Sequence, residues 1–234
     1  MLTPFQFKQF SIAQDLCAMK VGTDGVLLGA WSKVPNGNVL DIGSGSGLIS
    51  LMVAQRNKNC TIDAIDIDQQ AYLQTLNNIK NCPWNDRIKG HHTALQCFHP
   101  SSKYNLIISN PPFFINAFKA ENESKNRARH TDELSYQDFI HCATQLLQPS
   151  GILSVVLPVK EAEFFNDIAH QNKLYINRKC WVKPNSSKAP KRVLLEFRFH
   201  PKVVITEYLT IERDQRHDYT EEYRNLTQDF YLKF

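Results

Sequence analysis

The sequence predicts an α/β fold in which helices cover both faces of a mostly parallel β-sheet. Apolar strand-like runs alternate with helical runs from about residue 38 to residue 158, and this alternation is typical of parallel sheets with helical crossovers. A glycine-rich turn follows the first strand-like run, as it does in folds that bind nucleotides. The last third of the chain is rich in β-type residues instead, which predicts an antiparallel edge.

The alternating part is expected to contain five strands and three helices. The strands are expected at 38–42, 61–66, 87–93, 104–109 and 151–158, and the helices at 48–57, 69–81 and 134–148. Gly151 directly follows the last of these helices, so it is expected to end that helix in a left-handed conformation.

The C-terminal part predicts a β-hairpin followed by a helix. Two β-rich runs, 174–184 and 191–201, flank a polar loop and would form the antiparallel edge of the sheet. The segment 219–231 is expected to be helical, with Thr220 as its N-cap and Glu221 and Glu222 in its first turn. The chain has no internal repeat and no low-complexity linker, so residues 1–234 are expected to form a single domain.

Composition limits the classes of function. The chain has 234 residues, of which 42% are hydrophobic and 21% are charged, and this suits a packed globule. A net charge of +4 permits a nucleic-acid partner without requiring one. The first residues do not resemble a signal peptide and no apolar run is long enough to span a membrane, so the protein is expected to be cytoplasmic. The six cysteines occur singly and the eight histidines lack ligand spacing, so neither a metal site nor disulfides are expected.

The turn after the first strand carries Gly43, Gly45 and Gly47. Glycines let the backbone approach a ligand closely, and the following helix offers free N–H groups to an anion. The alternative is a tight turn without a ligand. Leu48 stands where the third glycine of a dinucleotide-binding G-x-G-x-x-G motif would be, which disfavours NAD. The spacing fits S-adenosylmethionine, whose carboxylate is the anion to be held.

Two aspartates are assigned to the same donor site. Asp66 ends the second strand, where an acid reaches the ribose hydroxyls of a bound nucleoside. Asp41 belongs to the strand that leads into the glycine turn. Asp68 is expected to cap the next helix instead, and Asp63 to lie within its strand.

The stretch "NPPFF", residues 110–114, follows the fourth strand and would project from the carboxyl edge of the sheet, where ligands bind. The side-chain oxygen of Asn110 and the carbonyl of Pro111 can accept the two hydrogens of an adenine amine and stabilise the positive charge that develops during methylation. Pro111 and Pro112 would hold these oxygens in place. Phe113 would stack on the base, which is worth about 1–3 kcal/mol, while Phe114 either contacts the base or packs in the core. The alternative is a rigid turn with two core phenylalanines.

Together, "VLDIGSGSG", "AIDID" and "NPPFF" resemble the class I S-adenosylmethionine-dependent methyltransferases that carry an N-P-P-[FY] motif. The longer stretches 7–31, 110–139 and 219–234 are similar to the family of bacterial tRNA1(Val) adenosine-37 N6-methyltransferases. The similarity runs over essentially the whole chain. The N-P-P-F motif alone is shared with enzymes that modify glutamine or guanine, so the flanking stretches carry the narrower resemblance.

This resemblance implies a Rossmann-like fold with a seven-stranded sheet, and methylation of N6 of the adenosine that follows the anticodon in a valine tRNA. It also implies that residues 1–37 cover the donor and residues 38–234 form the catalytic core, which makes Lys20, Thr23 and Asp24 candidates for the donor pocket. The chain departs from related enzymes at Leu95, where they often carry an acid that meets the adenine of the donor.

Two basic clusters are candidates for binding RNA phosphates. One comprises Arg127, Arg129 and His130, and the other Lys183, Lys188, Lys191 and Arg192. The alternative for each cluster is a solvated basic surface. Three other functions stay open: an N-P-P-motif methyltransferase that acts on another RNA base, a protein glutamine methyltransferase, which would not need the basic clusters, and an RNA-binding module without catalysis. The protein is expected to act as a monomer.

Overall fold

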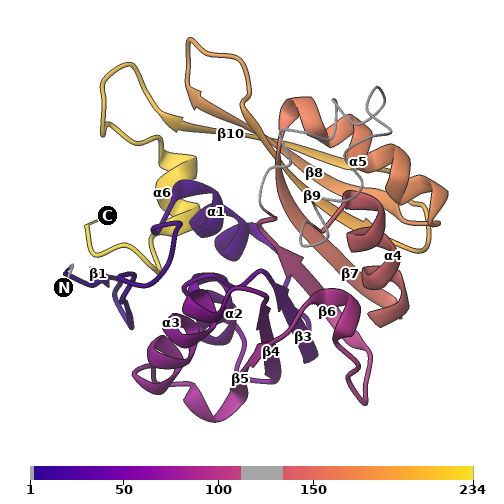
Figure 1. Cartoon of the computed structure of the whole chain (residues 1–234). Coiled ribbons are helices and arrows are strands. Elements are labelled where there is room, and N and C mark those ends of the chain that lie inside the picture. Colours follow the sequence, from indigo (N-terminus) through magenta and orange to yellow (C-terminus); the bar gives the residue numbers. More distant parts are fainter. Residues whose placement is uncertain (1–2, 112–133, 234) are drawn as a thin grey trace, which may run out of the picture.

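The computed structural model describes residues 3–111 and 134–233, and within these ranges eight strands form one mixed sheet (Figure 1). The strand order is β10-β8-β9-β7-β6-β3-β4-β5. The strands are β3 (Gly37–Ile42), β4 (Cys60–Asp66), β5 (Ile88–His92), β6 (Tyr104–Ser109), β7 (Leu147–Pro158), β8 (Tyr175–Asn185), β9 (Arg192–Arg198) and β10 (Ile205–Glu212). All neighbours pair in parallel except β9, which is antiparallel to both β7 and β8.

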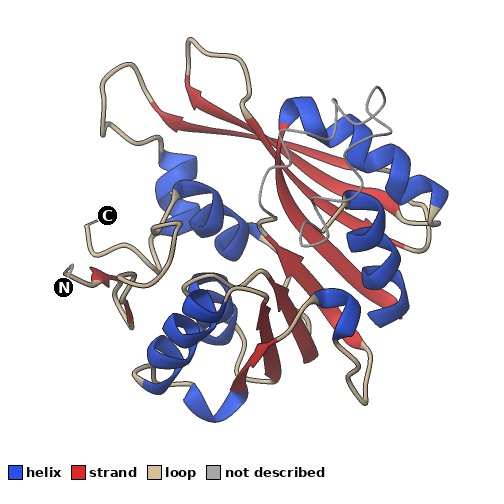
Figure 2. Ribbon diagram, in the orientation of Figure 1, coloured by secondary structure: helices blue, strands red, loops and turns tan. Residues whose placement is uncertain are grey.

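Helices lie on both faces of this sheet (Figure 2). They are α1 (Thr23–Trp31), α2 (Leu48–Arg56), α3 (Gln69–Lys80), α4 (Tyr136–Leu146), α5 (Val159–Gln171) and α6 (Glu221–Thr227). Residues of α1, α2 and α6 share one buried core with the sheet, and residues of α4 and α5 share a second core on the other face. Two short strands, β1 (Phe5–Gln6) and β2 (Ser11–Ile12), pair near the N-terminus, and 3₁₀ turns occupy Asn85–Arg87 and Leu95–Cys97.

Burial explains the strands that lead to the carboxyl edge. The last four residues of β3 and of β6 are buried, because helices cover both faces of the sheet there. This is why most residues in the second half of each strand are apolar.

The predicted α/β architecture is confirmed, and all seven expected strands are present. The hairpin of β8 and β9 also forms, but it is not the edge of the sheet, because β10 pairs in parallel with β8 outside it. Thr220 caps the C-terminal helix as expected, by accepting a hydrogen bond from the Tyr223 N–H, although the helix ends earlier than predicted, at Thr227.

The prediction for Gly151 was wrong. Strand β7 begins directly after α4, so Gly151 lies within the strand and has no positive φ. A Cβ atom at this position would lie 2.7 Å from Leu147 Cδ1. Close packing against Leu147 therefore accounts for this glycine.

Among the helices of the described residues, none combines the length and the apolar character that crossing a membrane requires.

Candidate active site

The glycine turn between β3 and α2 is built from left-handed backbone. Gly43, Gly45 and Gly47 have φ angles of 71°, 58° and 79°, which side chains other than glycine adopt only with strain. A Cβ added at Gly43 or Gly45 would meet no atom of the described residues within 4 Å. The turn therefore borders open space at these two positions, as a ligand that approaches the backbone requires.

A hydrogen bond joins the ends of β3 and β6. Ser109 Oγ donates to the carbonyl oxygen of Ile42 at 2.8 Å, so the next residues along the two strands, Gly43 and Asn110, leave the sheet side by side. Pro111 is buried and Asn110 is half-buried. Among the described residues, no group donates a hydrogen bond to the buried Asn110 Oδ1. A buried acceptor without a donor is costly, and a substrate amine would satisfy it.

Asp66 lies at the end of β4, beside the glycine turn. Its Oδ2 accepts from the Gly45 N–H at 2.8 Å and its Oδ1 accepts from the Asp68 N–H at 2.9 Å. Burial raises the pKa of this carboxyl group, while the backbone hydrogen bonds lower it. A carboxylate offers about four acceptor positions, so Asp66 can still bind ribose hydroxyls. Asp68 caps α3 by accepting from Ala71, as expected, and Asp63 lies within β4.

Asp41 has a different position from Asp66. Its side chain is fully buried beneath the turn, where Oδ2 accepts hydrogen bonds from the backbone N–H of Ser50 at 3.1 Å and from its hydroxyl at 2.7 Å. Burial raises the pKa of this carboxyl group to about 7. Within the described chain, Asp41 Oδ1 has no hydrogen-bond partner. Asp41 thus fastens β3 to the first turn of α2.

Two polar residues of α3 hold the glycine turn from the side, and a third bonds the N-terminal segment. Thr75 Oγ1 donates to the Gly45 carbonyl at 2.9 Å, and Asn78 Nδ2 donates to the carbonyls of Ser46 and Ala13, both at 2.8 Å. Gln74 Oε1 accepts from the N–H of residue 16 at 3.0 Å. The sequence analysis did not identify these residues. Their polar side chains on a face that also carries Ala71 and Ile79 were the available signal.

The candidate residues of the N-terminal segment lie near α1. Lys20 Nζ donates to the carbonyl of Cys17 at 3.2 Å. Thr23 is the first residue of α1, and Asp24 forms an ion pair with Arg192, with 2.8 Å between Oδ2 and Nε. The structure therefore pairs Asp24, which was expected to contact the donor, with Arg192, which was expected to contact the RNA.

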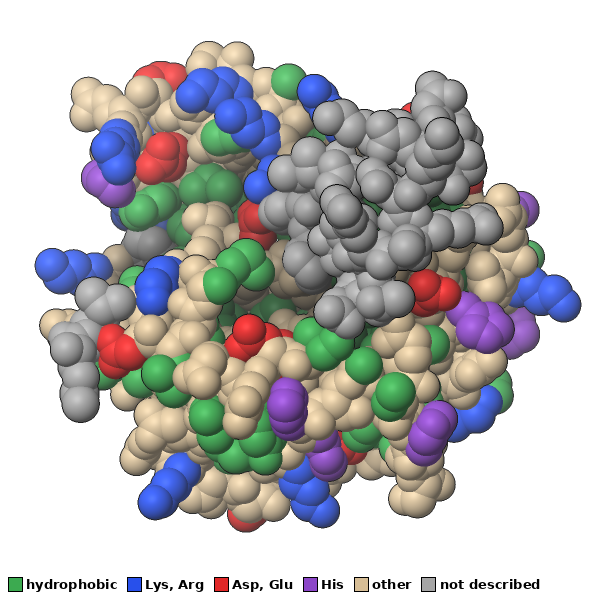
Figure 3. Space-filling model, in the orientation of Figure 1, with side chains coloured by type: hydrophobic (Ala, Val, Ile, Leu, Met, Phe, Trp, Pro, Cys, Tyr) green, Lys and Arg blue, Asp and Glu red, His purple; other side chains and the backbone are tan. Residues whose placement is uncertain are grey.

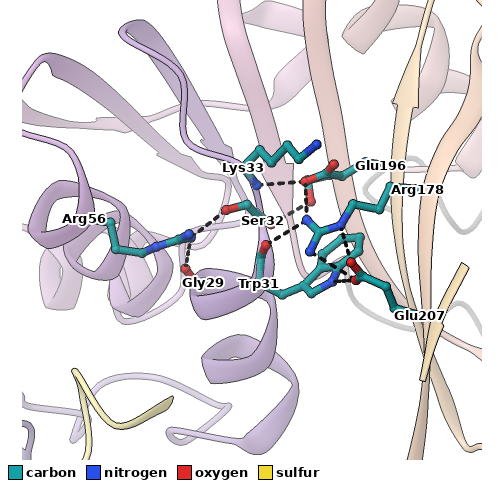
Figure 4. Close-up of polar contacts among 9 residues, drawn as sticks. Gly29, Trp31, Ser32, Lys33, Arg56, Arg178, Glu196 and Glu207 are labelled. Carbon is teal, nitrogen blue, oxygen red and sulfur yellow. Dashed lines mark hydrogen bonds and ion pairs between the residues drawn. The ribbon is translucent and has the colours of Figure 1, made fainter. Parts of the chain in front are cut away.

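A polar network anchors the other end of α1 to the C-terminal strands (Figure 4). The Arg178 guanidinium of β8 donates to the Trp31 carbonyl, bonds Glu196 of β9 and Glu207 of β10, and lies 4.0 Å from the centre of the Trp31 ring. Trp31 Nε1 also donates to Glu207 at 2.6 Å. These contacts fix α1 relative to β8, β9 and β10.

Some of the remaining predicted residues are described by the structure, and the others lie outside the described ranges. Lys188 and Lys191 are exposed on the loop between β8 and β9, and Lys183 is partly exposed at the end of β8. Leu95 is buried in the second core. The predictions for Pro112, Phe113, Phe114, Arg127, Arg129 and His130 lie outside the described residues.

The glycine turn, Asp66 and Asn110 together fit S-adenosylmethionine. The open space beside Gly43 and Gly45 admits an anionic group toward the N-terminus of α2. Asp66 has acceptor positions left for hydroxyls, and the unpartnered oxygen of Asn110 lies next to the turn. Residues 3–111 and 134–233 contain no cluster of three His, Cys, Asp or Glu side chains able to hold a metal ion, and their six cysteines are unpaired.

Comparison with known proteins identifies the family. The methyltransferase small domain family matches residues 19–164. The chain is 45% identical over 233 residues to the tRNA1(Val) (adenine(37)-N6)-methyltransferase of Flavobacterium psychrophilum, covering 98% of this chain and 99% of the relative. It is also 45% identical to the protein of the same name from Parabacteroides distasonis, with 98% of each chain covered.

Solved structures support the fold. A predicted O-methyltransferase from Agrobacterium tumefaciens superposes with a TM-score of 0.67 at 14% identity, covering 88% of this chain and 96% of the other. A glycopeptide N-methyltransferase solved with S-adenosylmethionine superposes with a TM-score of 0.56 at 11% identity, covering 77% of this chain and 100% of the other. The sequence resemblance is confirmed: the chain belongs to the methyltransferase small domain family and, within it, to the tRNA1(Val) (adenine(37)-N6)-methyltransferases.

Proposed function

We propose that this protein transfers a methyl group from S-adenosylmethionine to N6 of adenosine 37 in tRNA1(Val). One observation carries the proposal: the Ser109–Ile42 hydrogen bond brings Asn110, with its unpartnered oxygen, beside the glycine turn. An acceptor for an amine would thus adjoin a site for the donor. The name of the relatives supports the choice of substrate.

The donor would be held by the turn and by its flanking acids. Gly43 and Gly45 would leave room for its methionine carboxylate, Gly47 would let the turn enter α2, and Asp66 would accept hydrogen bonds from its ribose. Lys20, Thr23 and Asp24 belong to the segment that would cover it. When bound, S-adenosylmethionine supplies an electrophilic methyl group on a sulfonium centre. Asp41 would act as a positioning residue, because its carboxyl group is bonded to Ser50 below the turn.

The N-P-P corner would activate the acceptor amine. The lone pair of an adenine amine is delocalised into the ring, so the amine is a poor nucleophile, and positive charge develops on it during transfer. Asn110 Oδ1 and the Pro111 carbonyl would accept its two hydrogens and stabilise that charge. Proline after Asn110 restricts the backbone of Asn110, so these acceptors are held before the substrate binds. The extra proton then leaves to water, and no covalent enzyme intermediate is required.

The other predicted substrate contacts complete the proposal. Pro112, Phe113 and Phe114 would contact the base, and Arg127, Arg129 and His130 the RNA backbone, together with Lys188, Lys191 and Arg192. Because the target base is stacked in an anticodon loop, it would be splayed out into the site. We propose that one copy of the chain suffices.

The test uses unmodified tRNA1(Val), the purified protein and S-adenosylmethionine with a labelled methyl group. Digestion of the RNA followed by mass spectrometry should find one N6-methyladenosine per tRNA, and a transcript with guanosine at position 37 should remain unlabelled. Label in a protein glutamine, or equal labelling of the position-37 control, would contradict the proposal.

A further inference from the structure

The carboxyl edge of the sheet has an acidic side and a basic side. Asp66 and Asp68 lie at the β4 end, on the side of the glycine turn. On the other side of β6, beyond β7, the loops that follow β8 and β10 carry the exposed cations Lys188, Lys191 and Arg216. In Figure 3, Lys and Arg side chains gather over these two loops, at the upper left of the face shown.

The two loops form one surface although about 25 residues separate them in the chain. Strands β8 and β10 pair as far as Asn185 and Glu212, directly before the two loops. Ser186 Oγ then donates to Asp214 Oδ1 at 2.7 Å, which bridges the loops themselves. Figure 1 shows the ends of β8 and β10 running side by side into these loops.

Asp214 and Asp218 have partners within the protein, whereas the principal cations of this surface pair with no acid of the described residues. Asp214 accepts from Ser186, and Asp218 pairs with Arg213 at 3.4 Å. The stretch 183–192 contains four cationic residues and no acid. Within the described chain, Lys188, Lys191 and Arg216 have no side-chain ion pair. Exposed, unneutralised cations of this kind attract polyanions.

We propose that the β8–β9 and β10–α6 loops together bind the backbone phosphates of the RNA on one side of the target base, through Lys188, Lys191 and Arg216. This inference rests on the proposed function and extends it to the β10–α6 loop, which the sequence analysis did not assign. The acids at the β4 end repel phosphates, so the charge pattern directs the RNA across β7, β9, β8 and β10.

The spacing of the strands fits such a contact. Asn110 follows β6, and the sheet order puts β8 three strands and β10 four strands away. At about 4.8 Å per strand, the loops lie roughly 14–19 Å to the side of the reacting amine. This separation is too large for contact with the target nucleotide itself, but it suits the flanking backbone. The surface therefore contributes affinity rather than chemistry.

The test compares two triple variants with the same change in net charge. One, K188Q/K191Q/R216Q, neutralises the proposed surface. The other, K58Q/K103Q/K202Q, neutralises three exposed lysines that precede β4, β6 and β10 at the opposite edge of the sheet. Binding of unmodified tRNA1(Val) is measured from about 50 to 200 mM salt, and steady-state methylation is measured in parallel.

We expect the first variant to lower the slope of log affinity against log salt by about two to three units, and to raise KM for tRNA roughly tenfold to a hundredfold. Its kcat and its affinity for S-adenosylmethionine should match those of the wild type. The control variant should keep the wild-type slope within about half a unit. Equal slopes for the two variants would overturn the inference, as would a wild type that does not bind tRNA.

The inference and the proposed function can fail separately. A wild type that binds tRNA with the expected salt dependence, loses it only in the first variant, and methylates no adenosine 37 would keep the surface and refute the activity. If the wild type methylates adenosine 37 and the two variants are equally active, the activity is supported and the proposed surface is refuted.

Discussion

Asp41 lies beneath the glycine turn and Asp66 beside it, and their carboxyl groups have different surroundings. Asp66 accepts two backbone N–H groups and remains partly exposed, whereas Asp41 is fully buried and bonds only Ser50 among the described residues. Burial disfavours a charged carboxylate, so it raises the pKa of Asp41 more than the hydrogen bonds from Ser50 lower it, to about 7. The protonation state of Asp41, a residue expected from the sequence at the donor site, therefore affects the stability of the fold.

The shifted pKa of Asp41 predicts a pH dependence of folding. Its folded-state pKa lies above the unfolded value of 3.8, so the protonated carboxyl group stabilises the fold at low pH and this contribution is lost as pH rises through about 7. Between pH 5 and pH 8 the wild type should lose on the order of 3 kcal/mol of unfolding free energy that D41N does not lose. Urea unfolding of both proteins without ligand measures this difference.

The exposed aspartate Asp86 provides the control, because D86N should follow the wild type across the same pH range. If D41N and the wild type lose stability in parallel, the Asp41 carboxyl group is ionised in the folded protein at low pH and the interpretation fails.

Sequence analysis recognised the glycines of the site but not the residues that support them. Gly43, Gly45 and Asn110 occur in short motifs with distinctive residue types. Thr75 and Asn78 occupy positions that the periodicity of α3 makes buried, and only the fold shows that the groups above them are carbonyls of the turn. Polar side chains on a buried helix face need a partner, but the sequence does not name it.

At the scale of elements, the N-terminal helix is held at both ends by residues distant in sequence. Asp24 pairs with Arg192 at one end, and Trp31 contacts Arg178 at the other. The helix was not predicted, because "TDGVLLGAW" contains two glycines and has no polar residue after Asp24. A Cβ at Gly29 would lie 2.8 Å from Met52 Sδ, so close packing of α1 on α2 explains the glycine that weakens the helical pattern.

Removing Arg178 should destabilise the protein. The Glu196 side chain is only 3% exposed, so R178M leaves a buried carboxylate without its cation, and such losses cost about 3–5 kcal/mol. The matched control is R213M, which removes an exposed ion pair with Asp218 and should cost about 1 kcal/mol or less. Urea unfolding curves compare the two, and equal midpoints would show that the network in Figure 4 does not stabilise the fold.

Strand β10 was not predicted either, because its sequence also lacks a clear pattern of apolar residues. Ile205 and Tyr208 are exposed on this outermost strand, while Leu209 is buried, so the strand lacks the regular alternation that identifies a half-buried strand in sequence. Its partner is also distant, because pairing with β8 depends on how the hairpin folds back. The loop that completes the proposed RNA surface follows β10, so that surface could not be predicted either.

At the scale of the molecule, the alternation of strands and helices along the chain predicts the architecture, and the carboxyl edge of the sheet determines where the site lies. Parallel strands β3, β4 and β6 end at the same edge, so motifs far apart in sequence meet there whatever the details of the helices. This is why the donor turn and the N-P-P corner could be predicted together. The division of charge along that edge depends on strand order, which the motifs do not encode.

The account depends on Asn110 as the acceptor for the substrate amine. The most direct test replaces it with alanine and measures two quantities on the same preparation: the affinity for S-adenosylmethionine by calorimetry, and the rate of methyl transfer to unmodified tRNA1(Val) at saturating RNA. We predict donor affinity within about twofold of the wild type and a transfer rate lower by roughly 100- to 1000-fold. Transfer at the wild-type rate by N110A would contradict the account.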